Sequence, residues 1–233
     1  MSQFDEMTRR LIQLFVGLIL YGLSIALIVR ADLGLDPWDV LTQGVFERFA
    51  GPAGISFGLV VNLIGMAVLV LWIPLRQRPG IGTLANVLVI GVVAGFGLDW
   101  LPTDLGLPVR AVLLGAGILL NGVASGAYIG AGLGPGPRDG LMTGIFARTG
   151  WPVKWVRTTI EVIVVAVGWT LGGSVGLGTV VYAVSIGPLV HVFLPMFTIR
   201  TPAEPQGCKR YPPASVSSRR AWPGSGSIFW RRR

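Results

Sequence analysis

Charged residues inside apolar stretches are the candidate functional residues of this sequence. Pro37 and Pro137 each precede an aspartate by two positions, at Asp39 and Asp139, and Arg138 lies beside the second aspartate. A charge in hydrocarbon is costly unless it is paired or hydrated, so such residues often mark a binding site or an ion path. These five residues are therefore predicted to contact a small polar substrate or an ion.

A second charged pair lies in the apolar run 151–171. Glu161 is well inside this run, and Arg157 precedes it by four residues, so both side chains would lie on one face of a helix. The pair could line a polar path that crosses the membrane. It could equally be a structural ion pair that locks helices together. Both residues are kept as candidate substrate contacts.

Asparagines inside apolar runs form a weaker set of candidates. Asn62, Asn86 and Asn121 each lie within such a run. Hydrogen bonds between helices explain buried asparagines more often than ligand contacts do. Asn62 and Asn121 are nevertheless included among the predicted substrate-binding residues.

The prolines and aspartates belong to a segment that occurs twice. Residues 31–48 and 131–148, ADLGLDPWDVLTQGVFER and AGLGPGPRDGLMTGIFAR, are identical at nine of eighteen positions at an offset of 100. Chance would give about one or two matches in a chain so rich in Gly and Leu. Asp36 is predicted to be the N-cap of a short helix that starts at Pro37, and Gly136-Pro137 starts its counterpart.

The composition indicates that the solvent of this chain is a lipid bilayer. Hydrophobic residues make up 52% of the sequence and charged residues 13%, whereas soluble domains carry about 25% charge. Each apolar run has about 20 residues, enough to cross roughly 30 Å of hydrocarbon. The predicted spans are 11–29, 55–75, 81–101, 108–131, 151–171 and 178–197.

Six spans divide into two units of three, at 11–102 and 108–197. An odd number of crossings per unit turns the second unit upside down, which is the plan of many secondary transporters. We therefore predict an all-α membrane protein with six transmembrane helices in two inverted three-helix repeats, each with a short re-entrant or interfacial hinge helix. Residues 1–10 would form a polar cytoplasmic head, and 198–233, rich in Pro, Ser, Gly and Arg, a disordered basic tail.

The placement of the two hinge helices has alternatives. Half-helices that enter from opposite faces would bring their positive dipole ends to a shared site near the midplane. Alternatively, each hinge lies flat on the membrane surface, and Asp39 or Asp139 caps it in water. A full extra span in each unit would instead make the repeats parallel.

Basic residues orient the predicted topology. With a cytoplasmic N-terminus, the inside segments carry sixteen Lys and Arg and the outside segments carry three, or eight against three without the tail. The positive-inside rule therefore predicts that both termini are cytoplasmic. The same topology accounts for the net charge of +8, so no nucleic-acid partner is expected.

Signatures of enzymes and of metal sites are weak in this sequence. It contains no HExxH, CxxC or P-loop lysine motif. Cys208 and His191 are the single cysteine and the single histidine, which argues against a metal site built from these residue types. We expect no enzymatic activity, no catalytic residues, no metal and no cofactor.

Several motifs resemble one family of membrane proteins. The segments LGLDPWDVL and GLGPGPRDGLMTGI, the TIE of the fifth span and GLGTVVYAV look like those of the YczE/YyaS/YitT family of bacterial integral membrane proteins. The resemblance covers about 11–197; it departs from the family at Asp36, where glycine is expected, without disturbing the assignment. It implies a multi-spanning protein of the bacterial cytoplasmic (inner) membrane, of a kind often labelled only as a membrane protein or transporter.

The combined features favour a small-solute transporter or permease. Its site would lie near the membrane midplane, between the two repeat hinges, and its partners would be the lipid bilayer and a small-molecule or ion substrate. The alternative is a non-transporting accessory or scaffold protein, for which the hinges are only structural. The sequence does not specify the substrate, the transport direction, the coupling ion or the oligomeric state.

Overall fold

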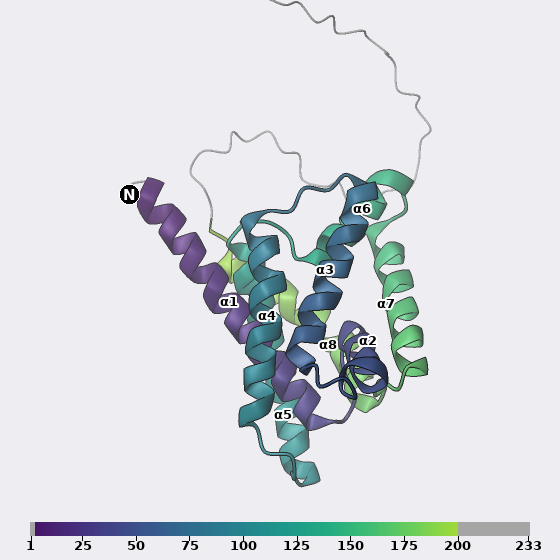
Figure 1. The fold of residues 1–233 in the computed structure, drawn as a ribbon. Helices are drawn as coiled ribbons and strands as arrows, with labels where there is room; N and C mark the ends of the chain where they lie inside the picture. The colour runs from purple at the N-terminus through teal and green to yellow at the C-terminus, as the bar shows by residue number, and fades with distance from the viewer. Residues whose placement is uncertain (1–2, 200–233) are drawn as a thin grey trace, which may run out of the picture. The chain divides into compact units, whose positions relative to one another are not determined.

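The computed structural model describes residues 3–199, and within them every regular element is helical (Figure 1). The predicted tail at 198–233 lies outside the described residues from Arg200 onward. The elements are α1 (Gln3–Ala31), α2 (Pro37–Val45), a π-helical turn η1 (Phe46–Ala50), α3 (Phe57–Leu75), α4 (Ile81–Trp100), α5 (Leu107–Gly130), α6 (Pro137–Thr149), α7 (Val153–Thr170) and α8 (Leu177–Phe197).

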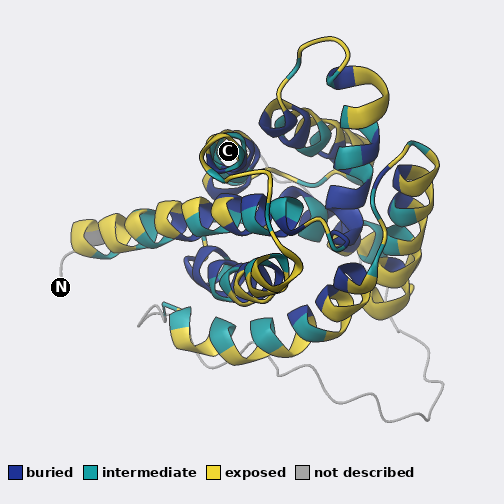
Figure 2. Cartoon of the chain, turned by 90° about the horizontal axis from the view of Figure 1, so that it is seen from below, coloured by how far each residue is buried: buried dark blue, intermediate teal, exposed yellow. Residues whose placement is uncertain are grey.

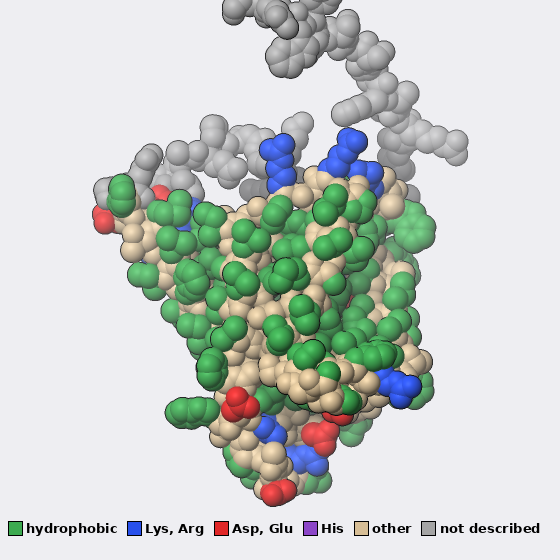
Figure 3. Space-filling view, in the orientation of Figure 1, with side chains coloured by type: hydrophobic (Ala, Val, Ile, Leu, Met, Phe, Trp, Pro, Cys, Tyr) green, Lys and Arg blue, Asp and Glu red, His purple; other side chains and the backbone are tan. Residues whose placement is uncertain are grey.

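Five of these helices are long and apolar enough to cross a membrane: α1, α3, α4, α5 and α8. The predicted fifth span is helical as α7, but it does not meet the same criterion because it carries Lys154, Arg157 and Glu161 within 18 residues. Hydrophobic side chains cover the side of the molecule that Figure 3 shows, and charged groups gather toward its two ends. An apolar outer surface of this kind suits contact with lipid rather than with water.

The observed helices follow the predicted apolar runs closely. One difference concerns the polar head at 1–10, which is helical from Gln3 and continues into the first span as one helix. Local signals define other boundaries. The Ser56 hydroxyl accepts a hydrogen bond from Leu59 N at the start of α3, and Arg76 ends that helix in a left-handed conformation with φ of 53°.

Helices α1 and α5 lie against each other at the centre of the fold, α4 packs on α1, and α8 packs on α5. Glycines permit these close approaches. A methyl group on Gly17 would lie 2.7 Å from Tyr128 N, and one on Gly22 would lie 2.7 Å from Ile90 O. Gly117 and Gly122, at an offset of 100, are equally crowded by Ile28 and Leu189. Figure 2 shows the buried residues on the helix faces turned to this interior.

Each short helix packs against a long helix that belongs to the other half of the chain. Helix α2 lies along α7, and helix α6 lies along α3. A methyl group on Gly44 of α2 would overlap the Gly168 carbonyl of α7, and one on Gly140 of α6 would overlap the Trp72 ring of α3. Each hinge helix is thus held by a long helix from the other half.

Two matching hydrogen bonds fix the segments that lead into α2 and α6. Gly178 N donates to Leu33 O at 2.8 Å, and Gly82 N donates to Leu133 O at 2.9 Å. The α7–α8 connection therefore lies beside the entry to α2, and the α3–α4 connection lies beside the entry to α6. In Figure 1 the long helices alternate in direction along the chain, with α2 and α6 toward opposite ends.

Candidate functional site

The site is built at the first turns of α2 and α6. The Asp36 carboxylate caps α2 by accepting hydrogen bonds from Trp38 N and Asp39 N, both at 2.8 Å, and Pro37 occupies the first turn, as the sequence predicts. Helix α6 begins in the same way at Pro137, but Gly136 offers no side chain to cap it.

Helix α2 is enclosed by protein along its whole length. Each of its residues is buried or half-buried, and the Asp36 and Asp39 residues are only 2% and 0% exposed. Asp39 therefore does not cap the helix in water, as the interfacial alternative required. The first turn of α6 is also buried at Pro137 and Gly140, whereas its last residues are exposed.

Arg138 joins the two helix starts. Its guanidinium lies 3.8 Å from Asp36 Oδ2 and 3.6 Å from Asp39 Oδ1, and its Cζ is 5.1 Å from the centroid of the Trp38 ring. One cation therefore faces two carboxylates and an aromatic ring. Asp36 Oδ2 and both Asp39 oxygens have no hydrogen-bond partner among the residues that the structure describes, so the ion pairs are looser than hydrogen-bonded ones.

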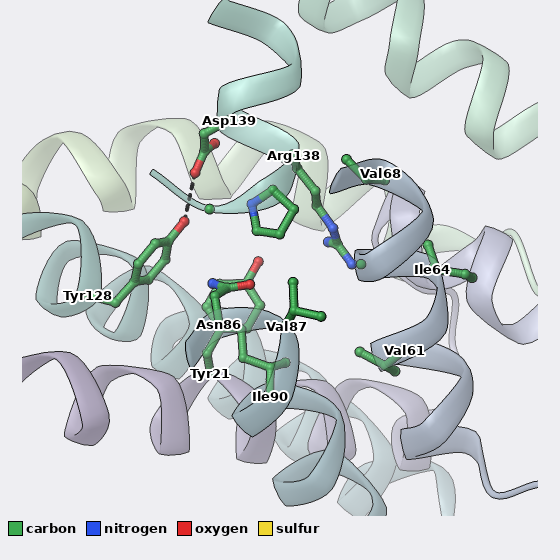
Figure 4. Close-up of a pocket in the computed structure, with 13 residues that line it drawn as sticks. Tyr21, Val61, Ile64, Val68, Asn86, Val87, Ile90, Tyr128, Arg138 and Asp139 are labelled. Atoms are coloured by element: carbon green, nitrogen blue, oxygen red, sulfur yellow. Dashed lines mark hydrogen bonds between the residues drawn. The ribbon is translucent and has the colours of Figure 1, made fainter. Parts of the chain in front are cut away.

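Asp139, the repeat counterpart of Asp39, has a different environment. Its Oδ2 accepts a hydrogen bond from the Tyr128 hydroxyl at 2.8 Å (Figure 4). The Tyr128 ring meets the Tyr21 ring edge to face, with centroids 5.9 Å apart. Equivalent aspartates of the two hinges thus have unlike partners, so the site is chemically asymmetric.

Two cavities flank this centre. The first, of about 70 Å³, lies between α3, α4 and the start of α6, and Asn86, Val61 and Ile90 contribute to its wall. Figure 4 shows Arg138 extending across it toward Ile64 and Val68 of α3. The second cavity, of about 190 Å³, lies between α2, α6, α7 and α8. Both cavities are lined by Tyr21, Tyr128, Arg138 and Asp139.

The predicted charged pair of α7 lines the second cavity. Arg157 Nε lies 2.7 Å from Glu161 Oε1, and the two side chains are 49% and 27% exposed. Both residues belong to α7, so their bond does not lock two helices together. Pro37 borders the same cavity and Pro137 the first one; the Pro137 carbonyl also accepts a hydrogen bond from Trp72 Nε1 at 3.0 Å.

The two predicted asparagines lie away from both cavities. Asn121 is buried, donates to Ser24 Oγ at 2.9 Å and accepts from the Tyr182 hydroxyl at 3.1 Å, which ties α5 to α1 and α8. Asn62 donates to Leu88 O at 3.4 Å and so connects α3 to α4. Their observed contacts are bonds between helices.

Several residues of the centre were not predicted as site residues. Asp36 was expected only to cap α2, and Trp38, Tyr21, Tyr128 and Tyr182 were not selected at all. One signal was available: Trp38 is the repeat counterpart of Arg138, so the repeat itself points to position 38. Among the described residues, no group of three or more His, Cys, Asp and Glu side chains could hold a metal ion.

One serine has the spacing of a hydrolase nucleophile. Gly172-Gly-Ser-Val-Gly176 matches GxSxG, but Ser174 lies in the connection between α7 and α8, and its N–H donates to Gln43 Oε1 at 2.7 Å. A nucleophile elbow requires a strand before this serine and a helix after it. Here a helix precedes Ser174, so the motif is not in that context.

The chain is similar to a known protein family and to several bacterial proteins. Residues 8–195 match the model of a family described as a family of unknown function (DUF6198). An uncharacterized protein of Haemophilus influenzae is 41% identical over 184 residues, covering 77% of this chain and 83% of that protein. The uncharacterized membrane protein YczE of Bacillus subtilis is 35% identical over 194 residues, covering 82% and 88%, respectively.

A more distant relative is the uncharacterized protein YyaS of Bacillus subtilis, 24% identical over 189 residues, covering 78% of this chain and 90% of that protein. No solved structure matches the chain. The predicted resemblance to YczE and YyaS is confirmed. Together with the five apolar helices, the similarity to a membrane protein shows that the chain is a membrane protein.

Proposed function

The chain belongs to the family of unknown function DUF6198, and on that premise we propose that it is a small-solute permease whose site lies between the N-terminal ends of α2 and α6. One observation carries the proposal: Arg138 of α6 pairs with Asp36 and Asp39 of α2, in the interior, between two cavities. Short helices whose N-terminal ends meet at a buried polar centre are a recurring way to build a transporter site.

The proposal includes the architecture predicted from the sequence. The halves 11–102 and 108–197 are inverted repeats, α7 is the fifth of six spans, and both termini are on the cytoplasmic side of the inner membrane. In each half, the short helix packs on a long helix of the other half, α2 on α7 and α6 on α3, and this exchange supports the repeat relation. So do the matched hydrogen bonds to Leu33 and Leu133. Within α7, Arg157 and Glu161 neutralise each other, which lowers the cost of burying them in a membrane.

The cavities are built from equivalent positions of the two repeats. At an offset of 96, which relates Gly80 to Gly176, residues of the first cavity correspond to residues of the second. The pairs are Val61 with Arg157, Gly65 with Glu161, Asn86 with Tyr182, and Ile90 with Ile186. We therefore interpret the cavities as two halves of one path, which Arg138 separates.

The two halves of this path differ in width. Helices α3 and α4 pack closely, whereas α7 and α8 make little contact with each other, and the second cavity is the larger one. In a permease with inverted repeats, the α7–α8 pair would close as the α3–α4 pair opens. This exchange would close the cavity on one side of the membrane and open the cavity on the other side. The wide second cavity then corresponds to the open side of this conformation.

Thiol labelling tests the proposal without knowledge of the substrate. In a Cys208→Ser background, Ser125→Cys places a thiol in the second cavity and Val87→Cys places one in the first. Leu18→Cys, fully buried and outside both cavities, is the control. A membrane-impermeant thiol reagent is applied to sealed vesicles of each orientation. A permease predicts that the two cavity thiols react and the control does not.

The same assay identifies substrates. Amino acids, amines and short carboxylates are added one at a time, and a substrate is expected to slow labelling of the Ser125→Cys variant. Radiolabelled forms of any such solute should then enter proteoliposomes. If neither cavity thiol reacts from either face, the permease is refuted, and the accessory or scaffold role remains.

A further inference from the structure

We propose that Asp39 is the proton-binding carboxyl group of this site, and that protonation of Asp39 loosens the contact between α2 and α6. The proton binding follows from the geometry of the centre alone. Its consequence, that transport is coupled to protons, rests on the proposed permease function.

The charges at the centre do not balance. Asp39 faces Asp36 of its own helix and Arg138 of α6, and one guanidinium serves both carboxylates. The other titratable groups around them are Asp139 of α6, which is bonded to Tyr128, and the hydroxyls of Tyr21 on α1 and Tyr182 on α8.

Within the described part of the chain, the neighbouring elements supply no second cation. Arg157 of α7 is already paired with Glu161, and helix α3 has no titratable side chain. Glu47 and Arg48 of η1 are exposed. Asp139 is half-buried and hydrogen-bonded to Tyr128, whereas Asp36 and Asp39 are both buried and share one guanidinium. One of these two carboxylates therefore lacks a counter-charge, and a proton is the smallest cation that can supply it.

The two carboxylates differ in how well their charge is stabilised. Asp36 Oδ1 accepts two backbone hydrogen bonds at the positive end of the α2 dipole, which favours its ionised form. Asp39 is fully buried, and neither of its oxygens accepts a hydrogen bond from any residue within 3–199. The ionised form of Asp39 is therefore the less stable of the two, and the proton belongs on Asp39.

A proton fits this position better than a metal cation. A hard divalent cation such as Mg²⁺ requires several oxygen ligands around one point, carboxylates among them, and the described residues hold no group of three or more Asp, Glu, His or Cys side chains that could hold a metal ion. Arg138 would also repel a metal ion. A proton needs one oxygen only, and Asp39 offers two free ones.

Protonation of Asp39 weakens the contact between α2 and α6. When Asp39 is neutral, one of the two ion pairs that join α6 to α2 is lost, and Arg138 stays bound to Asp36 alone. Arg138 lines both cavities, so a change in its position changes the barrier between them. A proton on Asp39 and the passage of a solute would be linked in this way.

Infrared difference spectroscopy tests proton binding directly. The purified full-length protein in lipid nanodiscs is stepped through pH, and the carbonyl stretch of protonated carboxyl groups is recorded in H₂O and D₂O. We expect a band that persists at higher pH than the bands of exposed carboxyl groups and is absent in the Asp39→Asn variant.

Asp36→Asn is the matched control, because Asn caps a helix as well as Asp does. This variant should keep the band. Its midpoint should move to lower pH, since Arg138 then serves Asp39 alone. A band that survives Asp39→Asn, or one that appears at no pH in Asp36→Asn, would overturn the proposal. The shift in Asp36→Asn gives a decisive readout even if the Asp39→Asn variant fails to fold.

A second measurement separates this inference from the permease function. Proteoliposomes that contain a pH-sensitive dye are given a solute found in the labelling assay. Solute-driven proton movement in the parent, absent in Asp39→Asn, supports the coupling, and solute uptake without proton movement refutes it while the permease stands. If the infrared band is assigned to Asp39 and no solute moves, proton binding is supported and the permease is refuted.

Discussion

At a pH where Asp39 is ionised, replacing Arg138 with glutamine is predicted to leave two buried carboxylates without a cation. Asp36 and Asp39 are 2% and 0% exposed, and Arg138 is the cation that faces both. Removing one partner of a buried ion pair costs about 3–5 kcal/mol. We expect the lower end, about 3 kcal/mol or a roughly 150-fold change in the unfolding equilibrium, because the pairs at 3.6 and 3.8 Å are not hydrogen-bonded.

The assay is equilibrium unfolding in mixed micelles with increasing sodium dodecyl sulfate, followed by tryptophan fluorescence. Arg138→Lys keeps the charge and loses the planar stacking on Trp38, so it should cost only about 1 kcal/mol. Adding Asp39→Asn to Arg138→Gln removes one stranded carboxylate and should restore about 1–2 kcal/mol.

The cost of Arg138→Gln should also shrink as the pH is lowered, because protons neutralise the carboxylates that the arginine leaves behind. An Arg138→Gln variant as stable as the parent would show that Arg138 does not stabilise the two aspartates. So would the absence of any recovery in the double variant with Asp39→Asn.

Further predictions concern packing and hydrogen bonds. Gly91→Ala should destabilise the fold by about 1–3 kcal/mol, because the new methyl group would overlap backbone of α3, while the repeat counterpart Gly187→Ala, with open space around it, should be neutral in the same unfolding assay. Asn121→Leu should cost about 1 kcal/mol, typical of a hydrogen bond between membrane helices; no loss would mean that its bonds to α1 and α8 do not stabilise the fold. Trp72→Phe should cost a similar amount, about 1 kcal/mol, through the lost bond to the Pro137 carbonyl, and a red shift of the remaining fluorescence would report that the start of α6 has opened.

Much of the fold follows from local sequence signals. Apolar runs of sufficient length predict the long helices, and the boundaries lie where prolines, caps and charges change the local preference. The two hinge starts at Pro37 and Pro137 are located by the repeat, because the same proline and aspartate recur at one offset. These features depend on residues close together in the chain, so they can be read without the tertiary structure.

The pairings at the centre depend on distant residues and were harder to predict. Arg138 was predicted to be a site residue beside Asp139, but no local pattern indicates that its side chain reaches two aspartates about a hundred positions away. Asn121 was proposed to bind substrate, but the faces of α1 and α8 that meet it determine its partners. The depth and rotation of a helix, which decide such contacts, are set by packing.

The most direct test of the account is the distance between the Arg138 guanidinium and the two aspartates of α2. Solid-state NMR on protein in lipid, with ¹⁵N-labelled arginine and ¹³C-labelled aspartate carboxyl groups, measures this distance by dipolar dephasing. An Asp32→Asn background removes the signal of the Arg110–Asp32 pair at 2.7 Å. We expect dephasing that corresponds to nitrogen–oxygen distances near 3.6 and 3.8 Å, weakened by Asp39→Asn. Absence of dephasing would mean that the starts of α2 and α6 do not meet, and it would rule out a site shared by the two helices.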